Sequence, residues 1–174
     1  MKFLTIPKVA YLPTVADGSL LLADVAENSR WCIPTKFVEG RPRPCVIVLG
    51  PFTGNDLGVP WLDFGDIPNP VAEFATWKPV PELSADKFNA EGHGNIDELG
   101  ALIYTESGEL FLQCAMQDSD AVFYYNFGDK TASFQPPREL SVAILRWSAV
   151  IEVEEPIRFH TLFHVEASGM RSDT

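Results

Sequence analysis

The strongest constraint on the fold is a two-residue alternation of apolar and polar side chains in the last third of the chain. Five apolar residues fall on one side of an extended segment: Leu145, Trp147, Ala149, Ile151 and Val153. Residues 157–165 alternate in the same way, as expected of strands, whose successive side chains point to opposite faces. Glycine-containing stretches at Ser107-Gly108 and Gly128-Asp129 predict two hairpins within residues 102–135. This part of the chain therefore predicts an antiparallel meander of about five strands.

The first fifty residues also predict strands. Extended segments are expected over three stretches, namely residues 9–15, 20–25 and 31–38. Asp17-Gly18 lies between the first two stretches, and this dipeptide is typical of a tight hairpin turn. The two prolines of residues 41–44 predict a connector. The continuous apolar run 45–49 that follows predicts a strand buried on both faces.

Residues 50–98 have a different composition, since six glycines and six prolines fall within this segment. A structureless loop of this length is rare in a compact domain, so we expect short helices there. Asn69 is placed to cap a helix that starts at Pro70 and ends at Trp77. Ser84 is placed to cap a second helix that ends by Gly92, and a further single turn is expected within residues 95–100.

Together these patterns predict a mainly β fold, with an antiparallel sheet arranged as a sandwich or a strongly bent meander. A few short helices are expected within residues 69–98, which would make the fold α+β on a generous count. The 174 residues fit one domain, and 46% hydrophobic residues allow a sizeable core. We expect a single domain over residues 1–167 and a polar tail over residues 168–174.

The net charge of −11 is unevenly placed along the chain. Residues 51–129 hold fourteen acidic residues but only Lys78 and Lys87 as bases, a net charge of −12. Such a surface repels nucleic-acid phosphates and anionic lipids, so neither nucleic acid nor a membrane is expected as a partner. A basic protein is the partner that this field would attract. The alternative explanation is that the charge serves solubility alone.

The cysteines indicate a reducing compartment. Cys32, Cys45 and Cys114 are an odd number without C-x-x-C spacing, which favours three free thiols over a disulfide framework. The N-terminus lacks the apolar run of a signal peptide, and no stretch reaches the roughly 18 apolar residues of a membrane span. We therefore expect a cytoplasmic protein. The sequence sets no oligomeric state.

No local motif assigns catalytic, metal-binding or cofactor-binding residues. His160 and His164 have the H-x3-H spacing of zinc ligands on a helix, but they fall in a predicted strand, where they would lie ~13 Å apart on one polar face. We predict that they hold no zinc. His93, between two glycines and close to Asp97 and Glu98, is the strongest candidate for a catalytic histidine, but an ordinary polar loop is the favoured interpretation.

Aromatic and acidic residues supply the candidate binding surface. Consecutive Phe123, Tyr124 and Tyr125 must place large rings on both faces of one strand. If one face is uncovered, its ring would anchor a partner that nearby carboxylates attract, and otherwise both faces are core. The candidate partner-binding residues are Asp56, Trp61, Asp63, Asp66, Asp118, Asp120, Tyr124 and Tyr125.

Three functions remain open on this sequence. The first is a non-enzymatic acidic protein that neutralises or escorts a basic protein partner, as the immunity protein of a bacterial toxin does. The second is a small hydrolase or metal-dependent enzyme whose site is assembled from distant residues. The third is a phage or assembly structural subunit, which should carry a large apolar self-interface.

Overall fold

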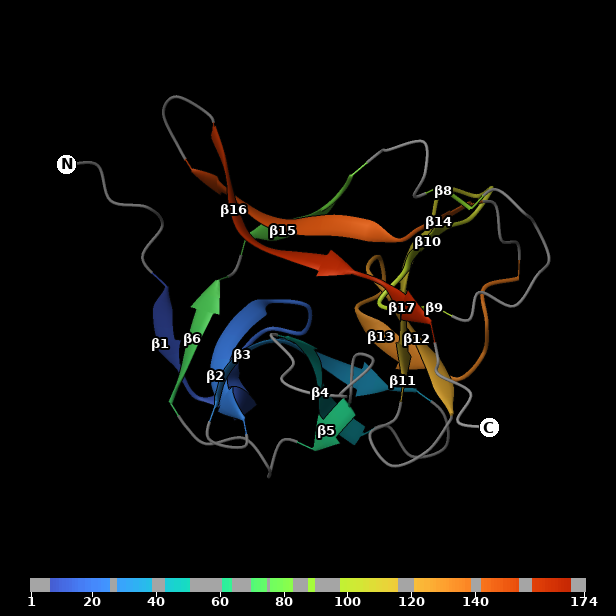
Figure 1. Ribbon diagram of the computed structural model, residues 1–174. Coiled ribbons are helices and arrows are strands. Elements are labelled where there is room, and N and C mark those ends of the chain that lie inside the picture. The colour runs from blue at the N-terminus through green and yellow to red at the C-terminus, as the bar shows by residue number, and fades with distance from the viewer. Residues whose placement is uncertain are drawn as a thin grey trace.

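The computed structural model is built almost entirely of β-strands (Figure 1). It describes residues 7–25, 28–38, 43–50, 61–63, 70–74, 76–82, 88–89, 98–115, 121–138, 142–153 and 158–169. The predicted mainly β, antiparallel fold is confirmed. Within these residues the helical structure is a single 3-10 turn, η1 (Leu12–Thr14).

The strands form three sheets. The largest sheet contains β1 (Lys8–Ala10), β2 (Leu20–Val25), β3 (Asn28–Phe37), β4 (Arg43–Gly50), β5 (Trp61–Asp63), β6 (Val71–Phe74), β8 (Phe88–Asn89), β10 (Leu102–Tyr104), β11 (Leu110–Ala115), β12 (Val122–Asn126), β13 (Thr131–Ser133) and β14 (Val142–Ile144). The second contains β7 (Trp77–Pro81), β15 (Arg146–Val153) and β16 (Arg158–Glu166). The third contains β9 (Glu98–Leu99) and β17 (Ser168–Gly169).

Strand β3 joins the two halves of the large sheet. Its first half pairs with β2, its last two residues pair in parallel with β13, and its other edge pairs with β4. The order β1-β6-β2-β3 therefore continues into β13-β12-β11-β10-β14-β8, while β4 and β5 branch from β3. The sheet is strongly bent, with β1, β6 and β2 on one side and β10 to β14 on the other (Figure 1).

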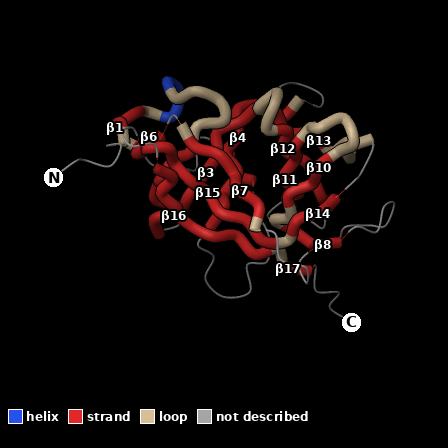
Figure 2. The backbone as a smooth tube through the Cα atoms, turned by 90° about the horizontal axis from the view of Figure 1, so that it is seen from above, coloured by secondary structure: helices blue, strands red, loops and turns tan. Residues whose placement is uncertain are grey.

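The three-stranded sheet runs across the concave side of the large sheet, and the main core lies between them (Figures 1 and 2). Trp147 of β15 is fully buried there, and Phe163 of β16 stacks on Trp31 of β3 with the ring centroids 5.2 Å apart. The predicted strand buried on both faces is confirmed in β4. Its Ile47 belongs to this main core, whereas Val46 packs into a second, smaller core beside β1 and β2.

Local hairpins were predicted well from the sequence. Strands β10 and β11 pair antiparallel around Ser107-Gly108, and β12 and β13 pair antiparallel around Gly128-Asp129, as expected. Strands β15 and β16 also form an antiparallel pair, but in the three-stranded sheet with β7 rather than in one continuous meander. The meander in the large sheet thus comprises β10, β11, β12 and β13, with β14 returning to pair with β10.

The helices predicted within residues 69–98 are wrong where the structure describes them. The stretch expected to run as a helix to Trp77 contains β6, in which Val71 and Glu73 are buried while the alternate residues are half-buried. The second expected helix contains β8, and the last expected turn contains β9. The residues typical of helix caps act only on their neighbours along the chain. The backbone N–H and C=O groups of β6 are satisfied by pairing with β1 and β2 on either side.

Three further details of the strands differ from the prediction. Residues 9–15 and 20–25 do not form a hairpin, because β6 lies between β1 and β2. The expected connector 41–44 overlaps β4, whose Arg43 and Pro44 pair with β3. Ser168 and Gly169, expected in the tail, pair with β9 as strand β17.

Gly18 occupies the junction where β2 and β13 meet along β3. Its N–H donates to the Pro34 carbonyl at 2.8 Å, and its own carbonyl accepts the indole N–H of Trp77 at 2.8 Å. Its φ is +81°, and an added Cβ would lie 2.9 Å from the Lys130 side chain and 3.0 Å from Tyr125 Oη. The junction therefore requires glycine for both its conformation and its space.

We expect Gly18→Ala to destabilise the protein more than Gly108→Ala. Gly108 has a similar φ of +85°, but nothing lies within 4 Å of an added Cβ, so only the backbone strain of about 1–2 kcal/mol applies. At Gly18 the crowding against Tyr125 adds roughly 1–3 kcal/mol. Urea unfolding of both variants measures the difference, and equal losses would contradict the steric role of Gly18.

Candidate functional site

An open groove of about 500 Å³ lies on the outer face of the β10–β13 meander. It is lined by Thr105, Ser107, Glu109, Phe111, Tyr124, Asn126, Asp129, Thr131, Ser133, Gln135, Pro136, Pro137 and Arg138. The lining thus combines two aromatic rings, six hydroxyl or amide side chains, two carboxylates and one guanidinium. A concave site with apolar rings and a few convergent polar groups is typical of ligand binding.

Strand alternation produces this face. In β12, Phe123 and Tyr125 point into the main core, so Tyr124 and Asn126 point outward. Register places outward residues of neighbouring strands side by side, because Tyr124 pairs with Ser133 and Asn126 pairs with both Phe111 and Thr131. The core face of the meander is apolar, and its outer face is mixed aromatic and polar.

The two acidic residues of the groove lie at its turn end and both contact Asn126, Glu109 through its carboxylate and Asp129 through its backbone N–H. The amide Nδ2 of Asn126 donates to Glu109 Oε1 at 3.4 Å, and its Oδ1 accepts the backbone N–H of Asp129 at 3.2 Å. Ser107 Oγ donates to Glu109 Oε2 at 3.3 Å. Within the described part of the chain, neither Glu109 nor Asp129 forms an ion pair. The Glu109 carboxylate is therefore held by neutral donors, and neither negative charge is neutralised by an ion pair there.

Tyr124 is the predicted binding residue that the structure places in this groove. Its side chain is half-buried, and burial raises the pKa of its hydroxyl. Its hydroxyl is therefore protonated at neutral pH and able to donate a hydrogen bond. Residues that pair with Tyr124 lie two strand positions away from residues that pair with Asn126. The two sets are therefore roughly 7 Å apart along the groove.

The other predicted binding residues have different outcomes. Tyr125 is 1% exposed and belongs to the core, which is the alternative that the sequence left open, so it cannot contact a partner. The backbones of Trp61 and Asp63 form part of β5, which is separated from β12 by β4, β3 and β13 in the pairing order. The remaining four residues lie outside the described residues: Asp56, Asp66, Asp118 and Asp120.

Sequence reasoning missed Glu109, Asn126, Asp129 and Arg138 as site residues. A signal for Asn126 was present, because Tyr124 and Asn126 alternate with the apolar residues of the same strand. The register that brings β11 and β13 beside them is not visible in the sequence, and neither is the return of residues 135–138 along the groove.

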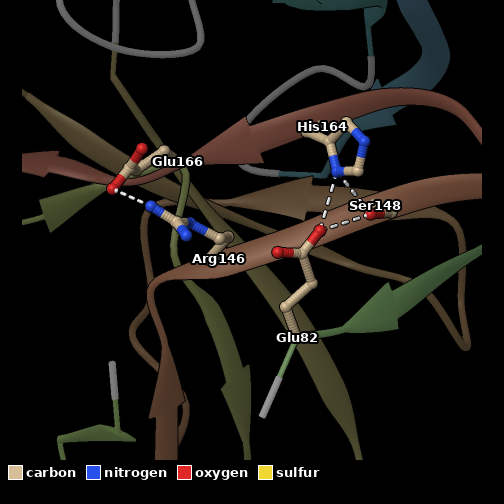
Figure 3. Close-up of polar contacts among 5 residues, drawn as sticks. All are labelled: Glu82, Arg146, Ser148, His164 and Glu166. Carbon is tan, nitrogen blue, oxygen red and sulfur yellow. Dashed lines mark hydrogen bonds and ion pairs between the residues drawn. The ribbon is translucent and has the colours of Figure 1, made fainter. Parts of the chain in front are cut away.

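A second polar cluster lies on the outer face of the three-stranded sheet (Figure 3). Glu82 Oε1 lies 2.7 Å from His164 Nδ1, and Ser148 Oγ donates to the same carboxylate oxygen at 2.7 Å. Ser148 Oγ is also 2.9 Å from His164 Nδ1. Serine, histidine and a carboxylate from distant parts of the chain thus meet, which bears directly on the hydrolase alternative.

The geometry of this cluster does not support nucleophilic catalysis. In a catalytic triad the carboxylate orients one ring nitrogen while the other accepts the proton of the serine. Here Ser148 and Glu82 both contact Nδ1, so no path links the serine hydroxyl through the imidazole to the acid. Neither Ser148 nor His164 lines the groove on the meander. The cluster instead ties the residue after β7 to β15 and β16.

The two histidines of the H-x3-H pair lie on opposite faces of β16, not on one face as predicted. Ala149 pairs with Phe163 but Val150 pairs with Thr161, so Leu162 is an extra residue that reverses the alternation. His164 pairs with Ser148, whereas His160 pairs with core-facing Ile151. This arrangement strengthens the physical argument against a shared zinc ion, which stays a prediction. His93 lies outside the described residues.

The carboxyl of Glu82 should titrate at unusually low pH. The Ser148 hydrogen bond, and then the His164 hydrogen bond, lower its pKa in the folded state. A lowered folded-state pKa stabilises the protein above the unfolded-state pKa, and this contribution is lost as pH falls through the folded-state value. Glu82 is about one-third exposed, so the contribution at neutral pH is below about 1 kcal/mol.

NMR titration of the Glu82 side-chain carbon tests this account. Ser148→Ala removes the largest cause, so the midpoint should rise relative to the wild type. Ser107→Ala, a serine in the other cluster, should leave that midpoint unchanged. An unchanged midpoint in Ser148→Ala would show that this hydrogen bond is not formed in solution.

The three cysteines are free and buried, in agreement with the predicted thiols. Burial raises the pKa of Cys32 to about 12. Burial, followed by the neighbouring Cys45, raises the pKa of Cys114 well above its usual value. Because the thiolate is the nucleophile, Cys32 and Cys114 are inert packing residues at neutral pH.

Among the described residues, no three histidine, cysteine, aspartate or glutamate side chains are grouped so that they could hold a metal ion. In the same part of the chain, no helix has the length and apolar character required to cross a membrane. Comparisons with protein-family models, with curated proteins and with solved structures found no match to this chain.

Proposed function

We propose that this chain is a non-enzymatic, acidic binding protein that engages a basic protein partner through the groove on the meander. The observation that carries the proposal is a groove lined by the half-buried ring of Tyr124 and by the carboxylates of Glu109 and Asp129, which form no ion pair within the described chain. A cytoplasmic immunity protein that neutralises a toxin is a protein of this type.

Electrostatics supports a basic partner. Glu109 and Asp129 belong to the segment 51–129, whose net charge is −12. Such a field accelerates the encounter with a positively charged protein and repels nucleic acid. Among the described residues of the groove lining, Arg138 is the single basic side chain. The carboxylates would therefore attract the partner, and Arg138 would restrict its orientation.

The rings of Phe111 and Tyr124 support retention of the partner once it is bound. Aromatic side chains at the centre of an interface contribute large contact areas, and the polar groups around them exclude water and fix the register. Residues such as Thr131 and Ser133 can donate to or accept from the backbone of a bound segment. The hydrolase alternative gains no support from the Ser148 cluster, for the geometric reason given above.

Association kinetics tests the proposed function. The partner is captured on the immobilised full-length protein at low salt, identified, and produced separately. Its association rate should then fall tenfold or more between about 0.05 and 0.5 M salt. A partner that is not basic, or a rate independent of salt, would overturn the proposal.

Charge-reversal variants test which acidic residues accelerate association with the partner. Asp129→Lys should slow association without unfolding the domain, because an exposed charge contributes little to stability. Reversal of Asp56, Asp118 or Asp120 should slow association as well. Asp24→Lys is the matched control, since it makes the same change in net charge on β2, away from the groove. Equal slowing by Asp24→Lys would show that only the total charge matters.

A further inference from the structure

We propose that two copies of this chain associate through the outer edge of β16, so that their three-stranded sheets join into one continuous sheet. Strand β16 lies at the outer rim of the molecule (Figure 2). This self-association goes beyond the proposed function, because the described lining of the groove includes no residue of β7, β15 or β16. The groove would stay open on both copies.

The first support is a row of outward-facing backbone groups along β16, which pairs within the described chain with β15 alone. The Glu82 N–H donates to the Arg146 carbonyl at 2.9 Å, so Arg146 and every second residue after it in β15 face β7. The β16 residues paired with these positions therefore face away from β15: Phe159, Thr161, His164 and Glu166. Such an open row of N–H and C=O groups is a template for another strand.

The opposite edge of the same sheet, on β7, is closed to strand pairing. Pro79 and Pro81 pair with Ala149 and Trp147, which are positions of β15 that face β16. The two prolines therefore occupy outward positions of β7, where proline has no N–H to donate. Strand β16 is nine residues long and contains no proline. Among the described residues, the three-stranded sheet thus offers a full set of outward donors on β16 only.

The spacing of the outward residues identifies a second copy as the occupant of this edge. The extra residue at the bulge separates Thr161 from His164 by three positions, and Phe159 and Glu166 each lie two positions further out. This order of spacings is the same in both directions. An antiparallel copy therefore places Phe159 opposite Glu166, and Thr161 opposite His164, at both ends of a two-fold pair. A regular strand, with outward residues at every second position, could match only one half of β16.

The open length of the edge also fits a second copy. Beyond Glu166 the edge is occupied, because β9 pairs with Ser168 and Gly169. Strand β16 itself begins at Arg158, one residue before Phe159. In the antiparallel register the copy therefore begins where the open edge ends.

Charge is complementary in the same register. The Lys78 ammonium lies 4.0 Å from the centroid of the Phe159 ring, which puts a positive charge at that end of the outer face. At the other end, the exposed carboxylate of Glu166 is ion-paired with Arg146 at 2.8 Å. The antiparallel copy brings Glu166 of each chain beside Phe159 and Lys78 of the other, so the ion pair gains a second cation. It also covers the Phe159 ring, which is 56% exposed in one chain.

Sedimentation velocity of the full-length protein over a range of concentrations tests the proposal. The wild type should form a dimer, and Thr161→Pro should raise the dissociation constant about tenfold or more, because proline removes an outward N–H. Thr161→Val keeps that N–H and should dimerise as the wild type does. A charge exchange gives a second test: Lys78→Glu should weaken the dimer, and adding Glu166→Lys should restore it. A wild type that is monomeric at every concentration, or a charge exchange that restores nothing, would overturn the proposal.

Disulfide crosslinking tests the register itself. In the proposed dimer Thr161 and His164 of the two copies lie directly opposite each other, with Cα atoms ~5.5 Å apart, which suits a disulfide. An equal mixture of Thr161→Cys and His164→Cys should therefore form a linked dimer when oxidised glutathione is added. Each variant alone should not, because equal residues of the two copies are offset by three positions, or ~10 Å. The natural cysteines are buried and add little background. A dimer that links equally well in the single variants, or not at all in the mixture, would show that β16 does not pair with itself in this way.

Discussion

Replacing Trp147 with alanine is expected to cost about 3–5 kcal/mol of unfolding free energy. Trp147 is fully buried on β15, between the two larger sheets. Its ring lies edge-on to Phe163 with the centroids 6.3 Å apart, and its indole N–H donates to the Gly100 carbonyl at 2.8 Å. Alanine would remove the ring from the interface and leave that buried carbonyl without its donor.

Trp147→Phe separates the two contributions. Phenylalanine keeps most of the apolar contact but cannot donate to Gly100, so its loss should be smaller than that of alanine and should include about 1–3 kcal/mol for the unsatisfied carbonyl. Urea unfolding followed by fluorescence and by circular dichroism measures both variants. A loss below about 1 kcal/mol in Trp147→Ala would mean that the three-stranded sheet does not pack on the large sheet as described.

The sequence predicted those parts of the fold that depend on neighbours along the chain. The turns at Ser107-Gly108 and Gly128-Asp129 join strands that pair with each other, so turn chemistry and alternation were sufficient. The position of β6 between β1 and β2 depends on pairing across fifty residues or more, which no local pattern encodes. Its four residues were predicted as part of a helix because Asn69 and Pro70 are the residue types of a helix start.

The candidate site was predicted in part for the same reason. The aromatic run in β12 predicted large rings on both faces of one strand and left open whether either face is uncovered, and Tyr124 lines the groove. The sequence could not determine which of Tyr124 and Tyr125 is outward, since alternation fixes only that they lie on opposite faces. Burial of Phe123 and Tyr125 in the core decides it. The acids that accompany Tyr124 come from two separate turns, and only the strand register brings them together.

Tyr125→Ala should destabilise the protein by about 3–5 kcal/mol, whereas Tyr124→Ala should cost far less and should instead raise the dissociation rate of the partner. Tyr125 packs edge-on to Phe127 at 5.0 Å, and its hydroxyl lies beneath the Gly18 junction. Burial, followed by the charge of Asp17 and then by Cys114, raises the pKa of that hydroxyl, so Tyr125 stays neutral throughout the physiological range.

The pair of variants is informative because the two tyrosines are adjacent and chemically identical, so only the face of β12 differs. Thermal and urea unfolding measure stability, and surface plasmon resonance with the identified partner measures the dissociation rate. Tyr124→Phe is the control for the groove, because it keeps the ring and removes only the hydroxyl, and it should retain most of the affinity if ring contact is what holds the partner. If Tyr124→Ala leaves the dissociation rate unchanged while Asp129→Lys still slows association, the carboxylates attract a partner that is held elsewhere. In that case the groove attracts the partner without retaining it, and the rings of Phe111 and Tyr124 do not anchor the complex.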